Sequence, residues 1–226
     1  MDPLTVAGVA AVAVVSITTH EASHGFVADR LGDPTAREMG RLTLNPLPHI
    51  DLFLTILLPL VLIVSGTGFI FGGAKPVPVN VARLRNPRRD WALVGAAGPL
   101  ANLAIALLLS VLLSLASRAG VVPSSPLVRT LAIGIFLNVL LAVFNLLPIP
   151  PLDGSRVVQY VLPDGALRVY RQIERVGLLL ILALVFFFRP LQSFLVDAVV
   201  VCTAMITAPL GVWRDVAPVL RSALFS

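Results

Sequence analysis

The stretch from Leu4 to Val27 constrains this chain more than any other, because it is long and apolar yet carries polar groups near one end. As a helix, its 24 residues would span about 36 Å at 1.5 Å per residue, which is enough to cross a bilayer. No charged residue precedes His20 in this stretch. His20, Glu21 and His24 then follow within five residues, so we expect these groups at membrane depth.

The spacing of the two histidines places them on one face of a helix, because side chains four residues apart lie one above the other. Both imidazoles can then reach one metal ion with Glu21 beside them, which is the H-E-x-x-H pattern of zinc ligands and a general base. The alternative is a polar cluster satisfied by neighbouring helices. Ionisable groups at membrane depth are costly and usually functional, so we interpret this cluster as a metal site.

The composition agrees with a membrane protein, since 57% of the residues are hydrophobic and 13% are charged, against about 25% charged in soluble domains. We expect an all-α polytopic fold with a single membrane-embedded domain over residues 1–226. Its catalytic core would cover about 4–160, with accessory helices over about 170–213. The net charge of +5 comes from arginines that flank apolar segments, so it does not indicate a nucleic-acid partner.

Further apolar segments predict about five to six transmembrane segments in all. They cover about residues 52–71, 91–117, 127–147, 176–188 and 191–212. Segment 52–71 is interrupted by Pro59, Gly66 and Gly68, and the following residues 72–80 are rich in proline and valine, which favours extended backbone. We therefore expect a re-entrant or extended hairpin segment near the active site.

A third metal ligand is suggested by the segment from Asn145 to Gly154, where three prolines in four positions must unwind the preceding helix. Asp153 comes at the end of this unwound segment. It is either a surface aspartate at an ordinary helix stop or a carboxylate ligand. Because two histidines still require a third ligand, we interpret Asp153 as that ligand.

Four other residues are candidates for binding substrate or the oxyanion. His49, in the polar loop 28–51, contacts the metal or substrate, or is simply solvated or hydrogen-bonded. Val77 and Val79 lie in the extended segment, which pairs with an unwound substrate strand or is only a connecting loop. Asn102 lies in an apolar helix and needs a partner within the bundle.

Three motifs together resemble the site-2 protease family of intramembrane zinc metalloproteases, in the small branch without a PDZ domain. They are HEASHG at 20–25, GPLAN at 98–102 and the segment 145–154, and the resemblance covers about residues 4–160. It implies cleavage of transmembrane protein substrates within the lipid bilayer. It also implies one zinc ion held by His20, His24 and Asp153, with Glu21 as catalytic base. Asn145 matches the asparagine of the family that assists substrate or oxyanion binding.

A second function class remains, which is a zinc-binding membrane protein without peptidase activity, such as a chaperone-like binder or a transporter. The intact Glu21 argues against it, because a purely structural zinc site needs no general base. A plain transport bundle with histidines on an ion path is a third interpretation, and the sequence shows no two-fold repeat to support it.

The basic residues predict the orientation, because cytoplasmic loops carry an excess of lysine and arginine. His24 and Asp153 come near the ends of the first and fourth segments, which simple alternation would place on opposite sides. A re-entrant segment 52–71, or an extended return through residues 72–82, brings these ends together. Fourteen of the 17 basic residues are then inside, and the three outside are Arg118, Arg129 and Arg189. We predict an external N-terminus, a cytoplasmic C-terminus and an active site toward the cytoplasmic side of a prokaryotic cell membrane.

Overall fold

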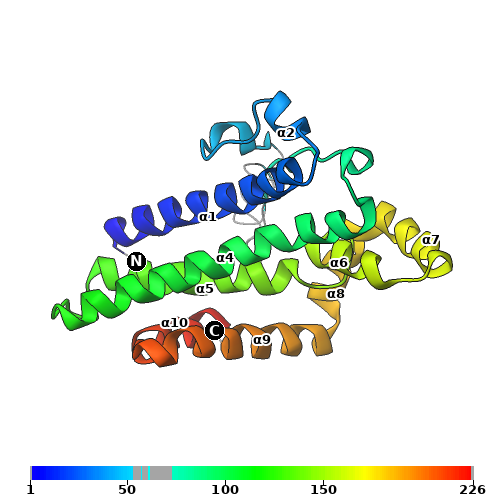
Figure 1. The fold of residues 1–226 in the computed structure, drawn as a ribbon. Helices are drawn as coiled ribbons and strands as arrows, with labels where there is room; N and C mark the ends of the chain where they lie inside the picture. The colour runs from blue at the N-terminus through cyan, green and yellow to red at the C-terminus, as the bar shows by residue number, and fades with distance from the viewer. Residues whose placement is uncertain (1, 53–56, 58–60, 62–72, 225–226) are drawn as a thin grey trace.

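The computed structural model describes residues 2–52, 57, 61 and 73–224, and all regular structure in these residues is helical (Figure 1). The prediction of an all-α fold is confirmed. The long helices are α1 (Pro3–Arg30), α4 (Pro87–Arg118), α5 (Pro126–Asn145) and α9 (Arg189–Thr207). The shorter helices are α2 (Thr35–Glu38), η1 (Leu47–His49), η3 (Val81–Arg83), α6 (Asp153–Val161), α7 (Asp164–Ile173), η4 (Glu174–Val176), α8 (Gly177–Phe187), η5 (Ala208–Leu210) and α10 (Trp213–Leu224).

Four helices in the described part of the chain are long and apolar enough to cross a membrane, namely α1, α4, α5 and the stretch Arg189–Leu210 that contains α9. The chain is thus a polytopic membrane protein. The predicted total of five to six segments also counted residues 52–71, most of which lie outside the described residues. It counted residues 176–188 as well, where α8 has only 11 residues and a length of about 16 Å, too short to cross alone.

The first residues of α1 and α5 show how the sequence sets the helix ends. The Asp2 carboxylate accepts a hydrogen bond from Thr5 N at 2.9 Å, and the Ser125 hydroxyl oxygen accepts one from Val128 N at 3.3 Å. Each capping residue is followed by a proline, which suits the first helical position because its missing N–H group has no partner there.

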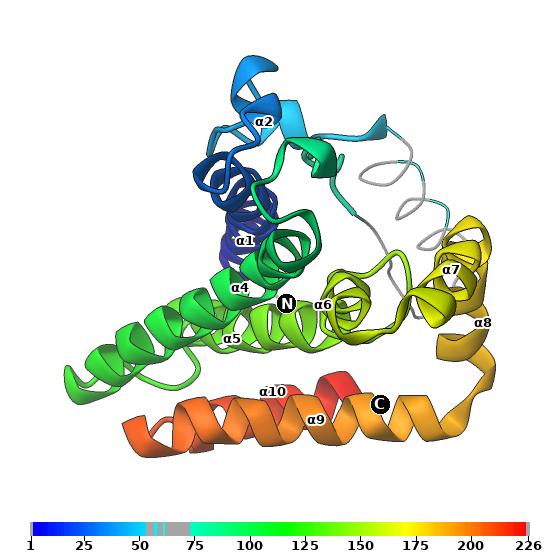
Figure 2. The same ribbon diagram turned by 45° about the vertical axis from the view of Figure 1, so that its right-hand side comes forward.

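Helices α4 and α5 pack together at the centre, with α1 on one side of this pair and α9 and α10 on the other (Figures 1 and 2). Glycines let α1 approach α5 closely. A Cβ atom on Gly8 would lie 2.6 Å from Thr130 Oγ1, and one on Gly134 would lie 3.0 Å from Val12 Cγ1. Small residues at such contacts allow close van der Waals packing, which holds helices together in lipid.

The main hydrophobic core lies between α4, α5, α9 and α10. Its most buried members include Leu113 of α4, Ile135 and Val139 of α5, Val199 of α9 and Val216 of α10, none more than 1% exposed. The C-terminal helices therefore share one core with the central pair α4 and α5.

One end of the bundle, which we call the α6 end, consists of α2, residues 73–85, α6 and α7 (Figure 1). α9 starts at this end, because Leu191 and Leu195 pack with Leu147 and Leu152 of the turn before α6. It then runs to the opposite end, where Ser114 Oγ donates to Leu210 O at 2.9 Å and Ser117 Oγ donates to Asp215 at 3.3 Å. The prediction that Arg214 lies on the same side as the active site is therefore wrong. The prediction that Arg189 lies on the opposite side is also wrong.

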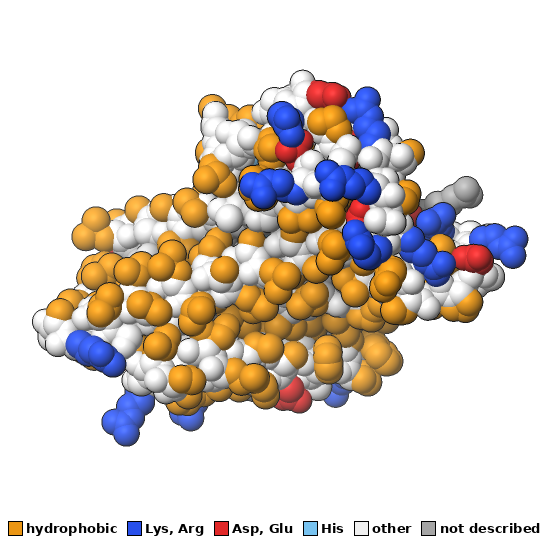
Figure 3. Space-filling view, in the orientation of Figure 1, with side chains coloured by type: hydrophobic (Ala, Val, Ile, Leu, Met, Phe, Trp, Pro, Cys, Tyr) orange, Lys and Arg blue, Asp and Glu red, His pale blue; other side chains and the backbone are white. Residues whose placement is uncertain are grey.

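The reason for this error is α8, which is too short to carry the chain across the bundle before α9 begins. Thirteen of the 17 basic residues now lie in the α6 end or in the loops and helix termini next to it (Arg30, Arg37, Arg41, Lys75, Arg83, Arg85, Arg88, Arg89, Arg156, Arg168, Arg171, Arg175 and Arg189). Arg118, Arg129 and Arg214 lie at the opposite end, with Arg221 further along α10. Figure 3 shows blue side chains gathered at the α6 end, beside a largely hydrophobic bundle surface.

Gly154 provides a test of how α6 is seated. A Cβ atom there would lie 2.2 Å from the backbone oxygen of Leu146, so the turn before α6 must move when the residue is larger. We expect Gly154→Ala to destabilise the protein by about 1–3 kcal/mol, measured as a lower thermal midpoint in detergent. Gly165→Ala in α7 is the control, because nothing lies within 4 Å of its Cβ position. Equal midpoints for the two variants would contradict this packing.

Candidate metal centre

Helix α1 positions the H-E-x-x-H residues at the level of the α6 end. His20 and His24 point toward α4 and are 7% and 3% exposed, with their ring centroids 4.8 Å apart. Glu21 lies on the neighbouring face of the helix and is half-buried. The four-residue spacing has thus produced the shared face that the sequence predicts.

Asp153 reaches the two histidines from the turn after α5. It is the first residue of α6 and 5% exposed. Its Oδ2 atom lies 3.1 Å from His20 Nε2 and 3.2 Å from His24 Nε2, and the two Nε2 atoms are 3.2 Å apart. The structure therefore brings together the three residues that the sequence suggests as ligands, and they form the one candidate metal group in the described part of the chain.

A chain of buried hydrogen bonds sets the tautomer of His20. Asn138 Nδ2 donates to the carbonyl of Gly134, so its Oδ1 is left to accept from Asn102 Nδ2 at 3.0 Å. Asn102 then presents Oδ1 to His20 Nδ1 at 2.6 Å. Because Oδ1 can only accept, His20 carries its proton on Nδ1 and a lone pair on Nε2.

The tautomer of His24 is set by the backbone of α4. Its Nδ1 lies 2.6 Å from the carbonyl oxygen of Val94, which can only accept a hydrogen bond. Pro99 lies within this part of α4, and a proline distorts the preceding helical turn, where Val94 and Gly95 lie. His24 therefore also directs a lone pair from Nε2 toward Asp153.

Three electron-rich atoms thus converge in a buried space, and Asp153 Oδ2 has no hydrogen-bond donor there. Ligand atoms held about 2.0–2.1 Å from a tetrahedral zinc ion lie about 3.3 Å from one another, close to the observed 3.1–3.2 Å. Two imidazole nitrogens and one carboxylate oxygen are a common ligand set for catalytic zinc. The residues present therefore fit a zinc ion.

Arg156 orients the carboxylate of Asp153 from the other side. Its Nη1 lies 3.2 Å from Asp153 Oδ1, and its guanidinium stacks on Trp91 at 4.4 Å from the ring centroid. Burial by itself raises the pKa of Asp153. The two neighbouring imidazoles and the charge of Arg156 outweigh burial and hold this pKa below its usual range.

Gly98 leaves the space in which the imidazoles meet. A Cβ atom at this position would lie 2.5 Å from His24 Nε2 and 2.6 Å from His20 Nε2. Any larger residue would therefore enter the space between the ligand atoms. This gives the GPLAN segment two roles at the site, since Gly98 provides room and Asn102 holds His20.

Residues 73–80 run past Glu21 without regular secondary structure and are held by several polar contacts. Val77 N donates to Glu21 Oε2 at 3.0 Å, so this segment contacts the expected general base directly. Lys75 N donates to His49 O at 2.8 Å, and Asn80 N donates to Asp33 Oδ2 at 2.6 Å. Arg41 Nη2 donates to Lys75 O at 2.9 Å.

The other candidate residues occupy different surroundings. Asn102 is fully buried with both amide atoms bonded inside the bundle, so it positions His20 and does not face a substrate. His49 lies outside the ligand group, with Nε2 3.0 Å from Thr43 O. Asn145 ends α5, and its Nδ2 donates to Leu141 O at 2.9 Å.

The side chains of Val77 and Val79 point into the protein. Val77 is buried, and its Cγ1 would lie 2.9 Å from a Cβ atom on Gly25, so the glycine after the second histidine lets this segment approach α1. Val79 packs against the cluster of Ala28, Leu84 and Val94. Contact with a substrate would therefore have to come from the backbone of this segment.

Sequence reasoning missed several residues that shape the site. Asn138 and Ser16 continue the hydrogen-bond chain behind Asn102, and their Nδ2 and Oγ atoms are 2.9 Å apart. Polar residues in apolar helices are the signal that could have revealed them. Arg156 follows Asp153 by three residues, a spacing that places both on one helix face.

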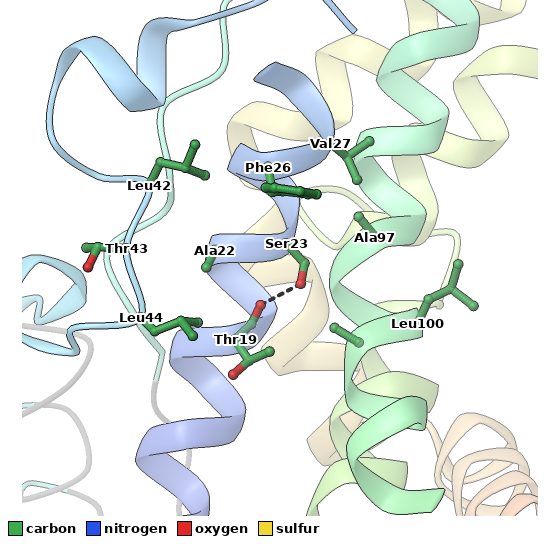
Figure 4. Close-up of a pocket in the computed structure, with 11 residues that line it drawn as sticks. Thr19, Ala22, Ser23, Phe26, Val27, Leu42, Thr43, Leu44, Ala97 and Leu100 are labelled. Atoms are coloured by element: carbon green, nitrogen blue, oxygen red, sulfur yellow. Dashed lines mark hydrogen bonds between the residues drawn. The ribbon is translucent and has the colours of Figure 1, made fainter. Parts of the chain in front are cut away.

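A groove of about 620 Å³ lies between α1, α4 and residues 42–44. Ala22, Ser23 and Phe26 of α1 face Ala97 and Leu100 of α4 across it (Figure 4). At about 100° per residue, these α1 side chains lie about 100–160° around the helix from Glu21. The groove is therefore apolar and separate from the face that carries the general base.

Comparison with known proteins identifies the class. Residues 114–188 match the profile of peptidase family M50. "Putative zinc metalloprotease YwhC" of Bacillus subtilis is 42% identical over 185 residues, covering 80% of each chain. "Putative zinc metalloprotease Rip2" of Mycolicibacterium smegmatis is 35% identical over 173 residues, which are 76% of this chain and 63% of that protein. The protein of the same name in Mycobacterium tuberculosis is 33% identical over 192 residues, which are 81% of this chain and 70% of that protein. No solved structure matches.

The chain is therefore a membrane-embedded metallopeptidase by family. It belongs to peptidase family M50, the site-2 protease family, as the three sequence motifs suggest.

The hydrogen-bond chain behind His20 yields a test. Leucine has nearly the shape of asparagine but cannot bond to the imidazole, so Asn102→Leu should weaken zinc binding about 10–100-fold. Asn138→Leu should cause a smaller loss, because it acts through Asn102. Zinc affinity is measured by chelator competition on purified protein. Ser110→Ala is the control, since Ser110 is buried in the same helix and, among the described residues, bonds to Ala106 O alone, at 2.8 Å. An unchanged zinc affinity in Asn102→Leu would refute the role of this hydrogen-bond chain.

Proposed function

We propose that this chain is an intramembrane zinc metalloendopeptidase, which hydrolyses peptide bonds in or near the transmembrane segments of membrane-protein substrates, as in regulated intramembrane proteolysis. The observation that carries this proposal is that lone pairs of His20, His24 and Asp153 converge in a buried space. Glu21 lies next to His20 on α1, a helix long and apolar enough to span the membrane. The names of the related zinc metalloproteases support the choice of metal.

His20, His24 and Asp153 would hold one zinc ion per chain. When bound, zinc acts as a Lewis acid that polarises the substrate carbonyl and acidifies water. Asn102 and Val94 keep the two imidazoles in the tautomer that can bind a metal, and Arg156 keeps the carboxylate turned toward them. These outer contacts fix the ligands in position before the metal arrives.

Glu21 would act as the general base, taking a proton from the attacking water and passing it to the leaving nitrogen. The hydrogen bond from Val77 N to Oε2 restrains the carboxylate, which leaves Oε1 for this proton transfer. Asn145 stands at the end of α5, directly before the turn that carries Asp153. We assign it to the substrate carbonyl oxygen on the basis of its match to the family motif.

The Glu21→Gln variant separates catalysis from metal binding. Glutamine keeps the shape of the side chain but cannot accept the proton, so cleavage of a membrane substrate in detergent should fall about 10²–10⁴-fold. Zinc content should stay at one per chain. Glu38→Gln, an exposed residue paired with Arg83, is the control and should keep full activity. A wild-type protein that binds zinc but cleaves no membrane substrate would instead indicate a zinc-binding protein without peptidase activity.

Residues 73–80 are the proposed contact for an unwound substrate, because this segment touches Glu21 and is exposed at Lys75 and Pro76. A photo-crosslinker at Pro76 should capture a substrate in the inactive Glu21→Gln background, because the substrate stays bound there. The same crosslinker at Val122, in the loop before α5, should capture none. Equal capture at both positions would count against the assignment.

We also propose one membrane-embedded domain with its α6 end in the cytoplasm. The shared core of α4, α5, α9 and α10 supports a single domain. The thirteen basic residues at the α6 end support the orientation, because such residues concentrate in cytoplasmic loops. The N-terminus would then be outside and the metal centre nearer the cytoplasmic face.

Cysteine labelling tests this orientation in a Cys202→Ser background. Single cysteines at positions 35, 85 and 165 should label from the cytoplasm, because α2, residues 73–85 and α7 belong to the α6 end. Cysteines at positions 122 and 214 should label from outside. Labelling of 214 from the cytoplasm would contradict the path of α9, and labelling of 35 and 85 from opposite sides would exclude the topology.

A further inference from the structure

Helix α9 carries a carboxylate where a membrane helix rarely tolerates one. Asp197 is the only charged residue between Arg189 and Arg214. It lies eight residues from Arg189, or about 12 Å into the span at 1.5 Å per residue, and its side chain is exposed. α9 is also the least covered span, with 17% of its apolar window buried against 44% for α5.

The other polar groups of α9 largely bond within the chain. Gln192 Nε2 donates to Val185 O at 2.7 Å, and the hydroxyls of Thr203 and Thr207 each donate to the backbone oxygen four residues earlier at 2.7 Å. Asp197, by contrast, makes no hydrogen bond or ion pair with any described residue. Residues 53–72 offer no ionic partner either, because they contain no lysine, arginine or histidine.

The side chain of Asp197 cannot place its carboxyl group at the polar interface of the membrane. Long lysine and arginine side chains can extend to the interface, but an aspartate is too short to cover about 12 Å. In either protonation state its carboxyl group needs a hydrogen-bonding partner in lipid. The surrounding outward residues are apolar apart from one hydroxyl, and we name the group the Asp197 face (Ser193, Phe194, Asp197, Val201 and Met205).

We propose that the Asp197 face docks a transmembrane helix of a partner protein, which carries a lysine or arginine side chain at the same depth. Charge complementarity favours this occupant, because a buried cation and carboxylate satisfy each other in lipid. A second copy of the chain fits less well. Its two-fold symmetry about the membrane normal would place Asp197 against its own equivalent, with like charges meeting.

The position of this face separates it from the metal centre. Helices α1 and α9 lie on opposite sides of the α4–α5 pair in both views (Figures 1 and 2). The partner helix would therefore bind away from Glu21, as a docked subunit and not as the segment being cut. The inference depends only on the membrane setting of α9 and stands apart from the proposed peptidase activity.

The test uses the full chain in phosphatidylcholine–phosphatidylglycerol vesicles. The probe is a synthetic leucine–alanine transmembrane peptide with one arginine about 12 Å from one end, compared with the same peptide lacking arginine. Energy transfer is measured from a dye on a cysteine at position 120, in the Cys202→Ser background. We expect the arginine peptide to associate about tenfold more strongly than the apolar one, and Asp197→Leu to remove this difference.

Charge reversal makes the test independent of any folding defect. Asp197→Lys should lose the arginine peptide and bind a matched peptide that carries glutamate. Leu112→Ala, a lipid-exposed change on α4, should bind the arginine peptide like the parent chain. Equal association with Asp197→Leu would overturn the proposal. Asp197-dependent energy transfer between two copies of the chain without peptide would also overturn it, because the occupant would then be a second copy.

Discussion

The structure depends on one electrostatic condition, which is that two imidazole lone pairs and a carboxylate oxygen meet in a buried space. These atoms lie 3.1–3.2 Å apart and repel one another unless a cation joins them. In a low-dielectric setting this repulsion is large, so the surrounding protein must hold the three groups firmly. Asn102, the carbonyl of Val94 and Arg156 provide that support, each from a different direction.

Glycines make the necessary close approaches possible. Gly98 leaves room for the imidazoles, Gly25 admits the segment that reaches Glu21, and Gly154 lets α6 turn back against Leu146. The polar network behind Asn102 satisfies its own groups through Asn138 and Ser16, as the apolar surroundings demand. Helix packing and site geometry are therefore set by the same small residues.

Much of this arrangement could be predicted from local patterns. Long apolar segments predicted α1, α4 and α5, and the four-residue spacing predicted that His20 and His24 share one helix face. The prolines before Asp153 indicated where the helix would unwind. Local patterns could not show that Asn102 and Asn138 bond in a fixed direction, because this depends on which helices become neighbours. The path of α9 was mistaken because an 11-residue helix, α8, looked like a crossing segment in a purely apolar stretch.

The central claim is that two histidines and one aspartate hold zinc, and X-ray absorption at the zinc edge tests it most directly. The purified zinc-loaded protein should show only nitrogen and oxygen ligands at about 2.0–2.1 Å, with the scattering of two imidazoles. Replacing His20 or His24 by alanine should remove one imidazole from that pattern. A zinc–sulfur distance of about 2.3 Å, which only Cys202 or a methionine could supply, or a spectrum without imidazole would contradict the account.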